Sequence, residues 1–264
     1  MGRLYDSLSI RRLKRRVAEY FDIAFNHQKT IYPRELLISS EAYNRVIVIT
    51  PHADDETFGC GGTIRLSTQS KKKVRVICIS DNIDSIGNGS YQSSEIRDIR
   101  KREFEEAMKI LGVTEYDYMD KSKQERQDIG QMAGCLGSIL IEYQPDVLYV
   151  PSVIDNHVEH RTLHQITYRI LNIQKQFRPT IRMYEVWSAI YPNVAVDISP
   201  CIEVKIDAMS AYASQQKMID YPHHILGLNA YRAMSAGAGK KYVEAFAELS
   251  TNEYLHYIKK YSAN

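Results

Sequence analysis

Four side chains capable of acid–base or metal chemistry stand within five positions of the stretch ITPHADDETFGCGGTI, at 49–64. They are His52, Asp54, Asp55 and Glu56. The stretch follows an apolar run typical of a buried strand and precedes a cluster of glycines. Neighbouring carboxylates repel each other, and their burial is costly unless a positive charge holds them. A bound cation would supply that charge, so the remaining ligands should be found elsewhere in the chain.

A second cluster, PSVIDNHVEHRTLH at 151–164, also follows an apolar run. It contains His157, Glu159, His160 and His164. In open α/β sheets, ligands bind outside the carboxyl ends of the strands. We therefore expect the two clusters to meet at one edge of the same sheet, although about 100 residues separate them.

These residue types suit a catalytic metal site with an open position. One aspartate, His52 and a distal histidine would make three ligands and leave room for water, as in catalytic zinc sites. The other aspartate could act as a base on that water, and a remaining histidine could stabilise an oxyanion or protonate a leaving group. His160 and His164, at i and i+4 of a helix, could instead form a metal pair with His164 as a ligand.

The glycines GCGG do not predict a nucleotide site. Their spacing matches neither nucleotide-binding fingerprint, and no GK[ST] follows them. A nucleotide-dependent activity is therefore disfavoured.

The elements expected around the clusters alternate along the chain. Short apolar runs at 45–50, 74–80 and 146–152 predict parallel strands buried on both faces. Amphipathic segments at 59–70, 94–111, 128–143 and 160–176 predict helices. This alternation indicates a doubly wound, mostly parallel α/β sheet.

Beyond residue 180 the pattern is less regular. Strands are expected at 180–187 and 193–199, and helices at 203–216 and 239–249. Between these helices, YPHHILGLNAYRAMSAGAG at 221–239 is interpreted as a loop. We predict that its first part lines a substrate pocket through Tyr231 and Arg232. A surface loop without such contact is an equal alternative.

The N-terminal segment 3–26 predicts a helix that is rich in arginine and lysine. A peripheral contact with a membrane surface or an acidic partner is one interpretation, and the solvated face of a docking helix is the favoured one. A net charge of +2 does not suggest a nucleic-acid partner. The four dispersed cysteines, the lack of a secretory leader and the lack of a long apolar stretch predict a cytoplasmic protein. A homo-oligomer is left open.

Four segments together resemble one known family. PHADDETFGCGGTI resembles the PHPDDE signature of the PIG-L/LmbE metal-dependent de-N-acetylases, and HVEH resembles that family's HxDH signature. IRKREFEEAMKILGV at 99–113 resembles its Arg-x-x-Glu helix, through Arg100 and Glu103. VDISPCIEVKIDAMSAYASQ resembles its late helix. The resemblance runs from about residue 45 to 217, and the paired first two motifs are its most specific part.

The resemblance implies a Rossmann-like fold, zinc (Zn²⁺) and an enzyme that hydrolyses the N-acetyl group of an amino sugar. It also implies a role for each matching residue: His52, Asp55 and His160 as metal ligands, Asp54 as general base, His157 as stabiliser of the tetrahedral intermediate, and Arg100 near the substrate. The expected organisation is an N-terminal helical extension at 1–40 and an LmbE-like deacetylase domain at 41–264.

The chain departs from the family pattern at two positions. Ala53 replaces a proline, which removes rigidity but no functional group. Glu159 replaces an aspartate and keeps a carboxylate that can orient His157 from a longer stem. Glu56 is expected to support the loop by hydrogen bonding. Neither departure removes a ligand or the base, so activity is expected.

Two other readings of the motifs stay open. The same metal chemistry would serve an amidase acting on a non-sugar or thiol-conjugate substrate. The second alternative is a pseudo-enzyme that binds sugar or protein without turnover. The intact set of histidines and aspartates argues against this alternative.

Overall fold

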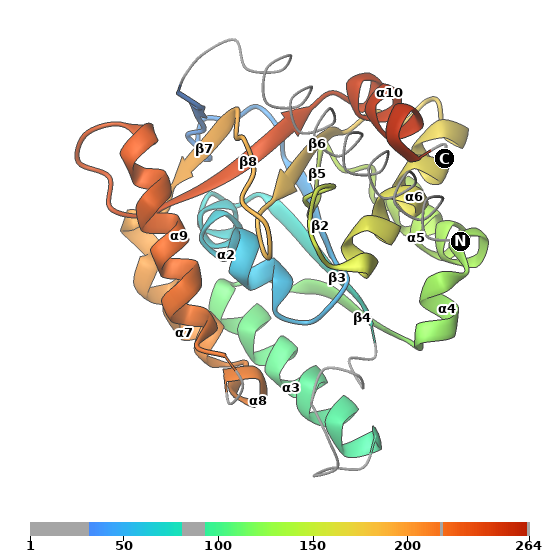
Figure 1. Cartoon of the computed structure of the whole chain (residues 1–264), viewed down its shortest axis with the longest axis horizontal. Coiled ribbons are helices and arrows are strands. Elements are labelled where there is room, and N and C mark those ends of the chain that lie inside the picture. The colour runs from blue at the N-terminus through green and yellow to red at the C-terminus, as the bar shows by residue number, and fades with distance from the viewer. Residues whose placement is uncertain (1–31, 81–92, 217–218, 263–264) are drawn as a thin grey trace, which may run out of the picture.

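The computed structural model describes residues 32–80, 93–216 and 219–262, which form a layered α/β structure around one eight-stranded sheet (Figure 1). The strand order is β1-β7-β8-β6-β5-β2-β3-β4. All neighbouring pairs are parallel except those that β8 makes with β6 and β7. The predicted mostly parallel, doubly wound sheet is therefore confirmed. Its strands are β1 Arg34–Glu35, β2 Arg45–Thr50, β3 Lys73–Ser80, β4 Glu115–Lys121, β5 Val147–Pro151, β6 Thr180–Tyr184, β7 Val194–Asp197 and β8 Val243–Leu249.

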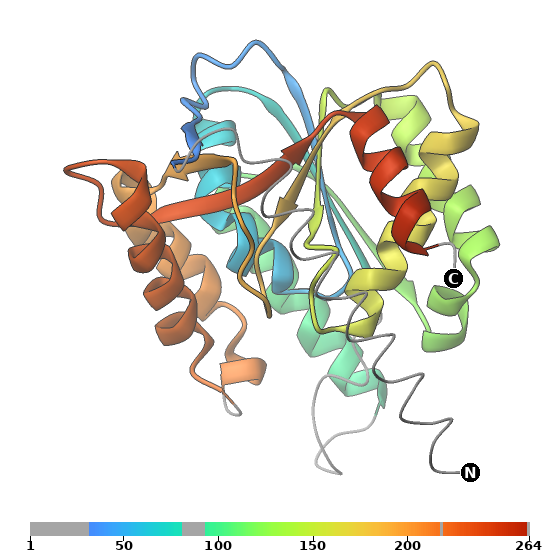
Figure 2. The ribbon, with the colours of Figure 1, turned by 45° about the horizontal axis from the view of Figure 1, so that its top comes forward.

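Helices cover both faces of the sheet (Figures 1 and 2). One face is packed by α2 Asp55–Gln69, α3 Ser93–Leu111 and α7 Ile202–Ser210, with α8 Ala213–Gln216 beside α3. The other is packed by α5 Ile129–Tyr143, α6 Val158–Ile173 and α10 Thr251–Ser262, with the short α4 Lys123–Gln127 beside α5. A 3₁₀ turn, Ser199–Cys201, precedes α7, and α9 Tyr221–Ala236 lies beside α7 at the β7–β8 end of the sheet.

The strand β2 shows why its sequence is continuously apolar. Val46 and Val48 belong to the core under α2 and α3, whereas Ile47 and Ile49 belong to the core under α5 and α6. Side chains alternate between the faces of a strand, so a strand covered on both sides needs apolar residues at every position.

The glycine cluster after the first motif serves close packing of α2. A Cβ atom at Gly59 would overlap the ring of Tyr184, and one at Gly62 would overlap Ile198. Glycine is used where another part of the chain comes this close. The cluster thus has a packing role, in agreement with its lack of a nucleotide fingerprint.

Two predictions beyond residue 180 are wrong. The segment 221–239 is not a loop, because residues 221–236 form α9, which begins where the Asp220 side chain accepts the amide N–H of His223 and carries Pro222 in its first turn. The segment 239–249 is not a helix, because residues 243–249 form β8, which pairs with strands on both sides. In addition, the predicted helix 203–216 is divided into α7 and α8, and β1, β4 and α10 were not predicted.

The predicted helix 3–26 lies outside the described residues. Residues 34–35 form β1, which pairs with β7, and Leu36 and Ile38 are buried in the core. Within the described ranges, no helix is long and apolar enough to cross a membrane.

Candidate active site

The two motifs meet at the centre of the sheet, because β2 and β5 are hydrogen-bonded neighbours. The strand β2 ends at Thr50, and Asp54 then caps α2 with a φ of 126°. The strand β5 ends at Pro151, and His157 caps α6. A non-glycine residue at positive φ is strained, and such residues cluster at functional sites. The short turns after the two strands thus bring the acidic motif and the histidine motif to one place.

Two histidines share one carboxylate oxygen. Asp55 Oδ2 lies 3.1 Å from Nδ1 of His52 and 3.0 Å from Nε2 of His160. A tetrahedral zinc with bonds of about 2.0–2.1 Å places its ligand atoms roughly 3.3 Å apart. Two imidazoles and a carboxylate are also donors that zinc accepts. The three side chains therefore fit a divalent metal in both spacing and chemistry.

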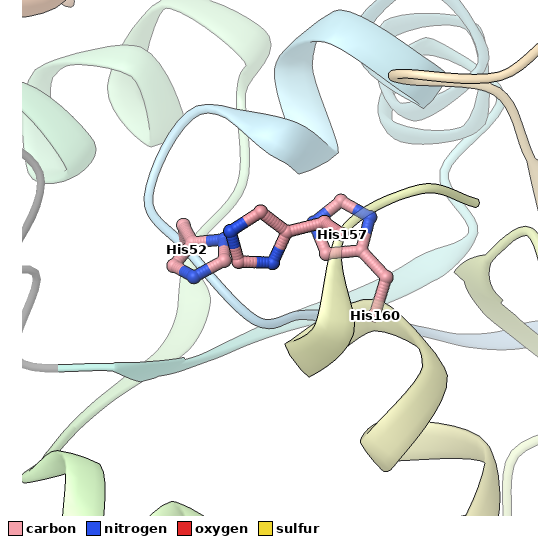
Figure 3. A group of neighbouring side chains, drawn as sticks. All are labelled: His52, His157 and His160. Atoms are coloured by element: carbon pink, nitrogen blue, oxygen red, sulfur yellow. The ribbon is translucent and has the colours of Figure 1, made fainter. Parts of the chain in front are cut away.

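His157 lies beside the same pair (Figure 3). Potential ligand atoms of His52, His157 and His160 all lie within 4.8 Å of one another. The backbone N–H of Glu159 donates to Nδ1 of His157 at 3.3 Å, which leaves Nε2 of the neutral ring as a donor. Burial, together with the neighbouring His52 and His160, lowers the pKa of His157. A neutral ring with its N–H on Nε2 suits a hydrogen bond to a developing oxyanion.

The charge balance of this cluster calls for a cation. Burial would lower the pKa of His52, but hydrogen bonds to Asp55 and Glu159 raise it to about 9. Burial has the same effect on His160, and Asp55 with Asp155 raises its pKa to about 10. The pKa of Asp55 is lowered by these histidines despite its burial. Positive charge between these groups is favoured, whether protons or a metal supply it.

Two further carboxylates orient the candidate ligands. Asp155 lies 3.3 Å from Nδ1 of His160 and accepts the backbone N–H of His157 at 2.8 Å. Glu159 lies 2.6 Å from Nε2 of His52 and accepts from Arg126 at 3.0 Å. Carboxylates that hold the second nitrogen of a ligating histidine fix its tautomer and orientation. The residue Asp155 was not predicted, although its place two positions before His157 was an available signal.

The carboxylate of Glu159 was expected to orient His157, and this expectation is wrong. Its carboxylate is occupied by His52 and Arg126, and only its backbone N–H contacts the His157 ring. The longer glutamate stem reaches across to the end of the neighbouring strand. Glu159 therefore supports His52 rather than His157.

Asp54 lies apart from the pair of histidines and has the properties of a base. Burial raises its pKa to about 7, against the opposing effect of the Arg100 guanidinium, which lies 2.8 Å from Oδ2. A general base works best with a pKa near the working pH. Glu56 accepts the backbone N–H of Asp54 at 3.2 Å and the hydroxyl of Tyr212, so it supports the turn that carries Asp54.

The guanidinium of Arg100 is held by protein groups. It donates to the carbonyl of Ala53 and to Asp54, and Nη1 donates to Glu103 at 2.9 Å. The side chain is fully buried and forms part of the cavity wall. In this arrangement Arg100 holds the candidate base, and the predicted substrate contact stays a prediction.

A cavity of about 330 Å³ opens over these groups, a size typical of small-molecule sites. It is lined by the catalytic candidates and by aromatic and basic side chains, namely His52, Asp54, Asp55, Arg100, His157 and Glu159, and Phe58, Trp187, Tyr221, Lys123 and Arg126.

The structure does not bring Tyr231 and Arg232 to this cavity. Neither is among the described residues that line it. Tyr231 is 60% exposed on α9, whereas Arg232 is buried and donates to Glu185 at 3.0 Å. The prediction that they contact substrate depended on a loop, and the helix α9 instead places Tyr221 at the cavity. The predicted segment 221–232 thus reaches the cavity, but through Tyr221, whereas Phe58 and Trp187 were missed because no local motif marks them.

His164 lies one turn beyond His160 and does not join the metal candidates. Its ring nitrogens lie 2.8 Å from the hydroxyl of Tyr254 and 2.9 Å from the carbonyl of Pro151. Burial lowers its pKa to about 4. A neutral, fully hydrogen-bonded ring indicates a structural histidine, which disfavours the alternative ligand pair.

Comparison with known proteins agrees with the motifs. Residues 47–171 match the model of the PIG-L family, described as GlcNAc-PI de-N-acetylase. This range contains both motifs and the Arg-x-x-Glu helix. The predicted resemblance is therefore confirmed over residues 47–171, which match the PIG-L family model.

The similarity to two named relatives extends beyond the motifs. The chain is 28% identical over 193 residues to a probable N-acetyl-alpha-D-glucosaminyl L-malate deacetylase 2 of Bacillus cereus, covering 67% of this chain and 87% of the relative. It is 24% identical over 188 residues to diacetylchitobiose deacetylase of Thermococcus kodakarensis, covering 65% and 70%. Both relatives are named as deacetylases of N-acetylated sugars.

Solved structures share the fold. The N,N'-diacetylchitobiose deacetylase of Pyrococcus horikoshii superposes with a TM-score of 0.72 at 21% identity, covering 90% of this chain and 94% of that one. The 4-carboxy-2-hydroxymuconate hydratase of Pseudomonas putida superposes with a TM-score of 0.66 at 17% identity, covering 78% and 96%. Because a hydratase shares this fold, the reaction has to be argued from the site.

Proposed function

We propose that the protein is a zinc-dependent hydrolase that removes the N-acetyl group of an amino-sugar substrate and releases acetate. The observation that carries the proposal is the carboxylate of Asp55 set between His52 and His160, with the separate carboxylate of Asp54 in the same cavity. Ligands and a base are thus distinct groups. The names of the two deacetylase relatives support the substrate class.

In this proposal His52, Asp55 and His160 hold the metal. A divalent cation bound there would lower the pKa of a water molecule and polarise the acetamide carbonyl. Asp54 accepts the proton of the attacking water, and its raised pKa of about 7 suits this transfer near neutral pH. Arg100 holds the carboxylate of Asp54 in place through Oδ2.

His157 acts on the other end of the carbonyl bond. Its Nε2–H donates to the oxygen that becomes negative when water adds to the acetamide carbon. Asp54 then gives its proton to the sugar nitrogen, so that the C–N bond breaks and an amine and acetic acid leave, and the acid ionises to acetate on release. The proton balance is closed, because the base that takes one proton returns it to the leaving group.

The substrate screen that tests the proposal measures acetate release. N-acetylglucosamine, N-acetylglucosaminyl malate and diacetylchitobiose are offered to the full chain with and without added zinc. We expect hydrolysis of at least one sugar only with metal. Hydrolysis of non-sugar acetamides alone would favour the amidase reading and contradict the sugar assignment.

We also propose that the protein functions in a reducing compartment, the cytoplasm. The four cysteines, all among the described residues, form no disulfide bond, and Cys60, Cys78 and Cys201 are buried. Unpaired cysteines are usual in proteins of the cytoplasm.

A further inference from the structure

The cavity has an aromatic wall that the proposed chemistry does not use. Phe58, Trp187 and Tyr221 come from α2, the loop after β6 and the start of α9. The rings of Phe58 and Tyr221 stack at 5.1 Å with an angle of 21°, and the rings of Trp187 and Tyr221 meet edge to face at 5.9 Å. These segments are far apart in the sequence, so the wall is built by the tertiary fold.

Trp187 is held in place although its side chain is 47% exposed. Its backbone N–H donates to Asp155 Oδ2 at 3.1 Å. The same carboxylate contacts His160 and the backbone of His157. The position of the indole is therefore tied to the groups that surround the candidate metal.

The other end of the tryptophan loop is fixed by a buried ion pair. Glu185 accepts the backbone N–H of Ile190 at 2.8 Å and the guanidinium of Arg232 at 3.0 Å, and Arg232 also donates to the carbonyl of Ile190 at 2.7 Å. Both ends of the segment 185–190 are thus anchored. A large apolar ring that is rigidly presented at a cavity, with half of its surface exposed, has the features of a binding surface.

We propose that the pyranose ring of the substrate stacks on the exposed indole of Trp187, and that the ring of Tyr221, set at 86° to the indole, bounds the sugar from the side. This inference rests on the proposed function and names the residues that select a cyclic sugar over an open-chain acetamide. The C–H face of a pyranose is apolar and flat enough to pack on an aromatic face, whereas its hydroxyl groups remain available for hydrogen bonds. Phe58, only 3% exposed, backs the ring of Tyr221.

The chain offers a direct probe, because Trp187 is its only tryptophan. N-acetylglucosamine is titrated into the full chain, with and without zinc, and the tryptophan emission is followed. The open-chain alcohol N-acetylglucosaminitol, which has the same groups but no ring, is the matched ligand. A saturable change with the cyclic sugar and a much weaker one with the alcohol supports the proposal. No change with either ligand, or equal changes, would overturn it.

Kinetics provide the second test. Trp187→Ala and Tyr221→Ala are expected to raise KM for the cyclic substrate roughly three- to tenfold, as the loss of one aromatic contact predicts. Metal content and KM for an open-chain acetamide should not change. Trp187→Phe should restore most of the affinity, and Tyr231→Ala, on the exposed part of α9, should have no effect.

The outcomes separate this inference from the proposed function. If sugars are deacetylated but both alanine variants keep the wild-type KM, the stacking surface is disproved and the function stands. If no sugar is hydrolysed, the function fails, while the emission titration still decides whether this wall binds a pyranose ring.

Discussion

Two clusters of charged side chains contact α2, one through Asp55 at its start and the other through the backbone of Gly62 and Thr63. The first is the motif cluster, which we define as His52, Asp55, Asp155, Glu159 and His160. The second is the Lys205–Glu244 cluster, formed by Lys205, Asn229 and Glu244, which are all buried, whereas His52 and Glu159 of the first cluster are half-buried. Both contain charges that would be costly to bury without compensation.

The Lys205–Glu244 cluster is complete in itself. The ammonium of Lys205 donates to Glu244 at 2.6 Å, to Asn229 at 3.0 Å and to the carbonyl of Phe58 at 2.9 Å. Glu244 also accepts backbone N–H groups of α2, from Gly62 and Thr63, each at 2.8 Å. Every donor of the ammonium is used, and one positive charge faces one negative charge.

The motif cluster is not balanced in this way. It contains three carboxylates and two histidines, and the pKa values of His52 and His160 are raised to about 9 and 10 by those carboxylates against the effect of burial. Arg126 offsets the charge of Glu159, and a divalent cation would offset the other two carboxylates without protons on the histidines. The comparison teaches that a balanced buried pair is structural, whereas an acidic excess beside histidines indicates a ligand site.

The largest effect is expected from removing a candidate metal ligand. His160→Ala should lose metal and acetate release together, because its nitrogen lies 3.0 Å from Asp55 and would supply one of the three proposed ligands. Elemental analysis and an acetate assay on the same preparation measure both. His164→Ala serves as the control, since that ring is bonded to Tyr254 and Pro151. A His160→Ala protein that keeps stoichiometric metal would contradict the ligand assignment.

The next effect concerns the base alone. Asp54→Asn keeps the shape but cannot accept the water proton, so turnover should fall roughly 10²–10⁴-fold. Metal content should not change, because Asp54 is held by Arg100 rather than by the histidines. Loss of metal in this variant would make Asp54 a ligand, and near wild-type turnover would remove it as the base.

Breaking the balanced cluster should affect folding rather than metal binding. Lys205→Met leaves Glu244 buried without its cation, and removal of one partner of a buried pair costs about 3–5 kcal/mol. Denaturant unfolding is expected to show this loss, while the folded protein still binds one metal. A lowered metal stoichiometry in folded protein would show that the two clusters are coupled.

The difference between the clusters also explains what could be predicted from the sequence. The motif cluster lies in the turns after two strands and in the first turns of the helices that follow, and each strand is continuously apolar because both of its faces are buried. Short-range patterns therefore indicated the strands, the histidines and the acidic residues. These patterns do not indicate which side chain each carboxylate contacts. For this reason Glu159 was assigned to His157 rather than to His52.

The second cluster depends on contacts that no local pattern contains. Glu244 lies on β8, whose sequence VEAFAEL was predicted as a helix because alanine and glutamate favour helices. Its place between β6 and β7 overrides that preference, and the glutamates point to Lys205 and Arg182. In α9, tyrosines and glycine suggested a loop, but packing against β8 and the cap at Asp220 form a helix.

A smaller effect is expected from a residue that supports a ligand. Asp155→Asn keeps the shape of the side chain but weakens its hold on Nδ1 of His160. Loss of such a partner typically costs 10–100-fold in metal affinity. Competition with a chelator of known affinity measures the change. Unchanged affinity would mean that Asp155 serves only the loop backbone.

The smallest effect is a pH dependence of stability due to His164. Burial lowers its pKa to about 4 from an ordinary value near 6.5, so folding favours the neutral ring. Its contribution is fully present above pH 6.5 and is lost as the pH falls toward 4. Urea midpoints of His164→Gln, measured from pH 7 to pH 4, should fall less steeply than those of the wild type. Parallel curves would assign the pH dependence to other groups.

The most direct test of the account is a metal titration of the chelator-treated full chain, followed by acetate release from an N-acetylated sugar. We predict no release without metal, and a rise with zinc that saturates at one equivalent per chain. Full acetate release by metal-free protein would contradict the assignment of His52, Asp55 and His160 as the metal site.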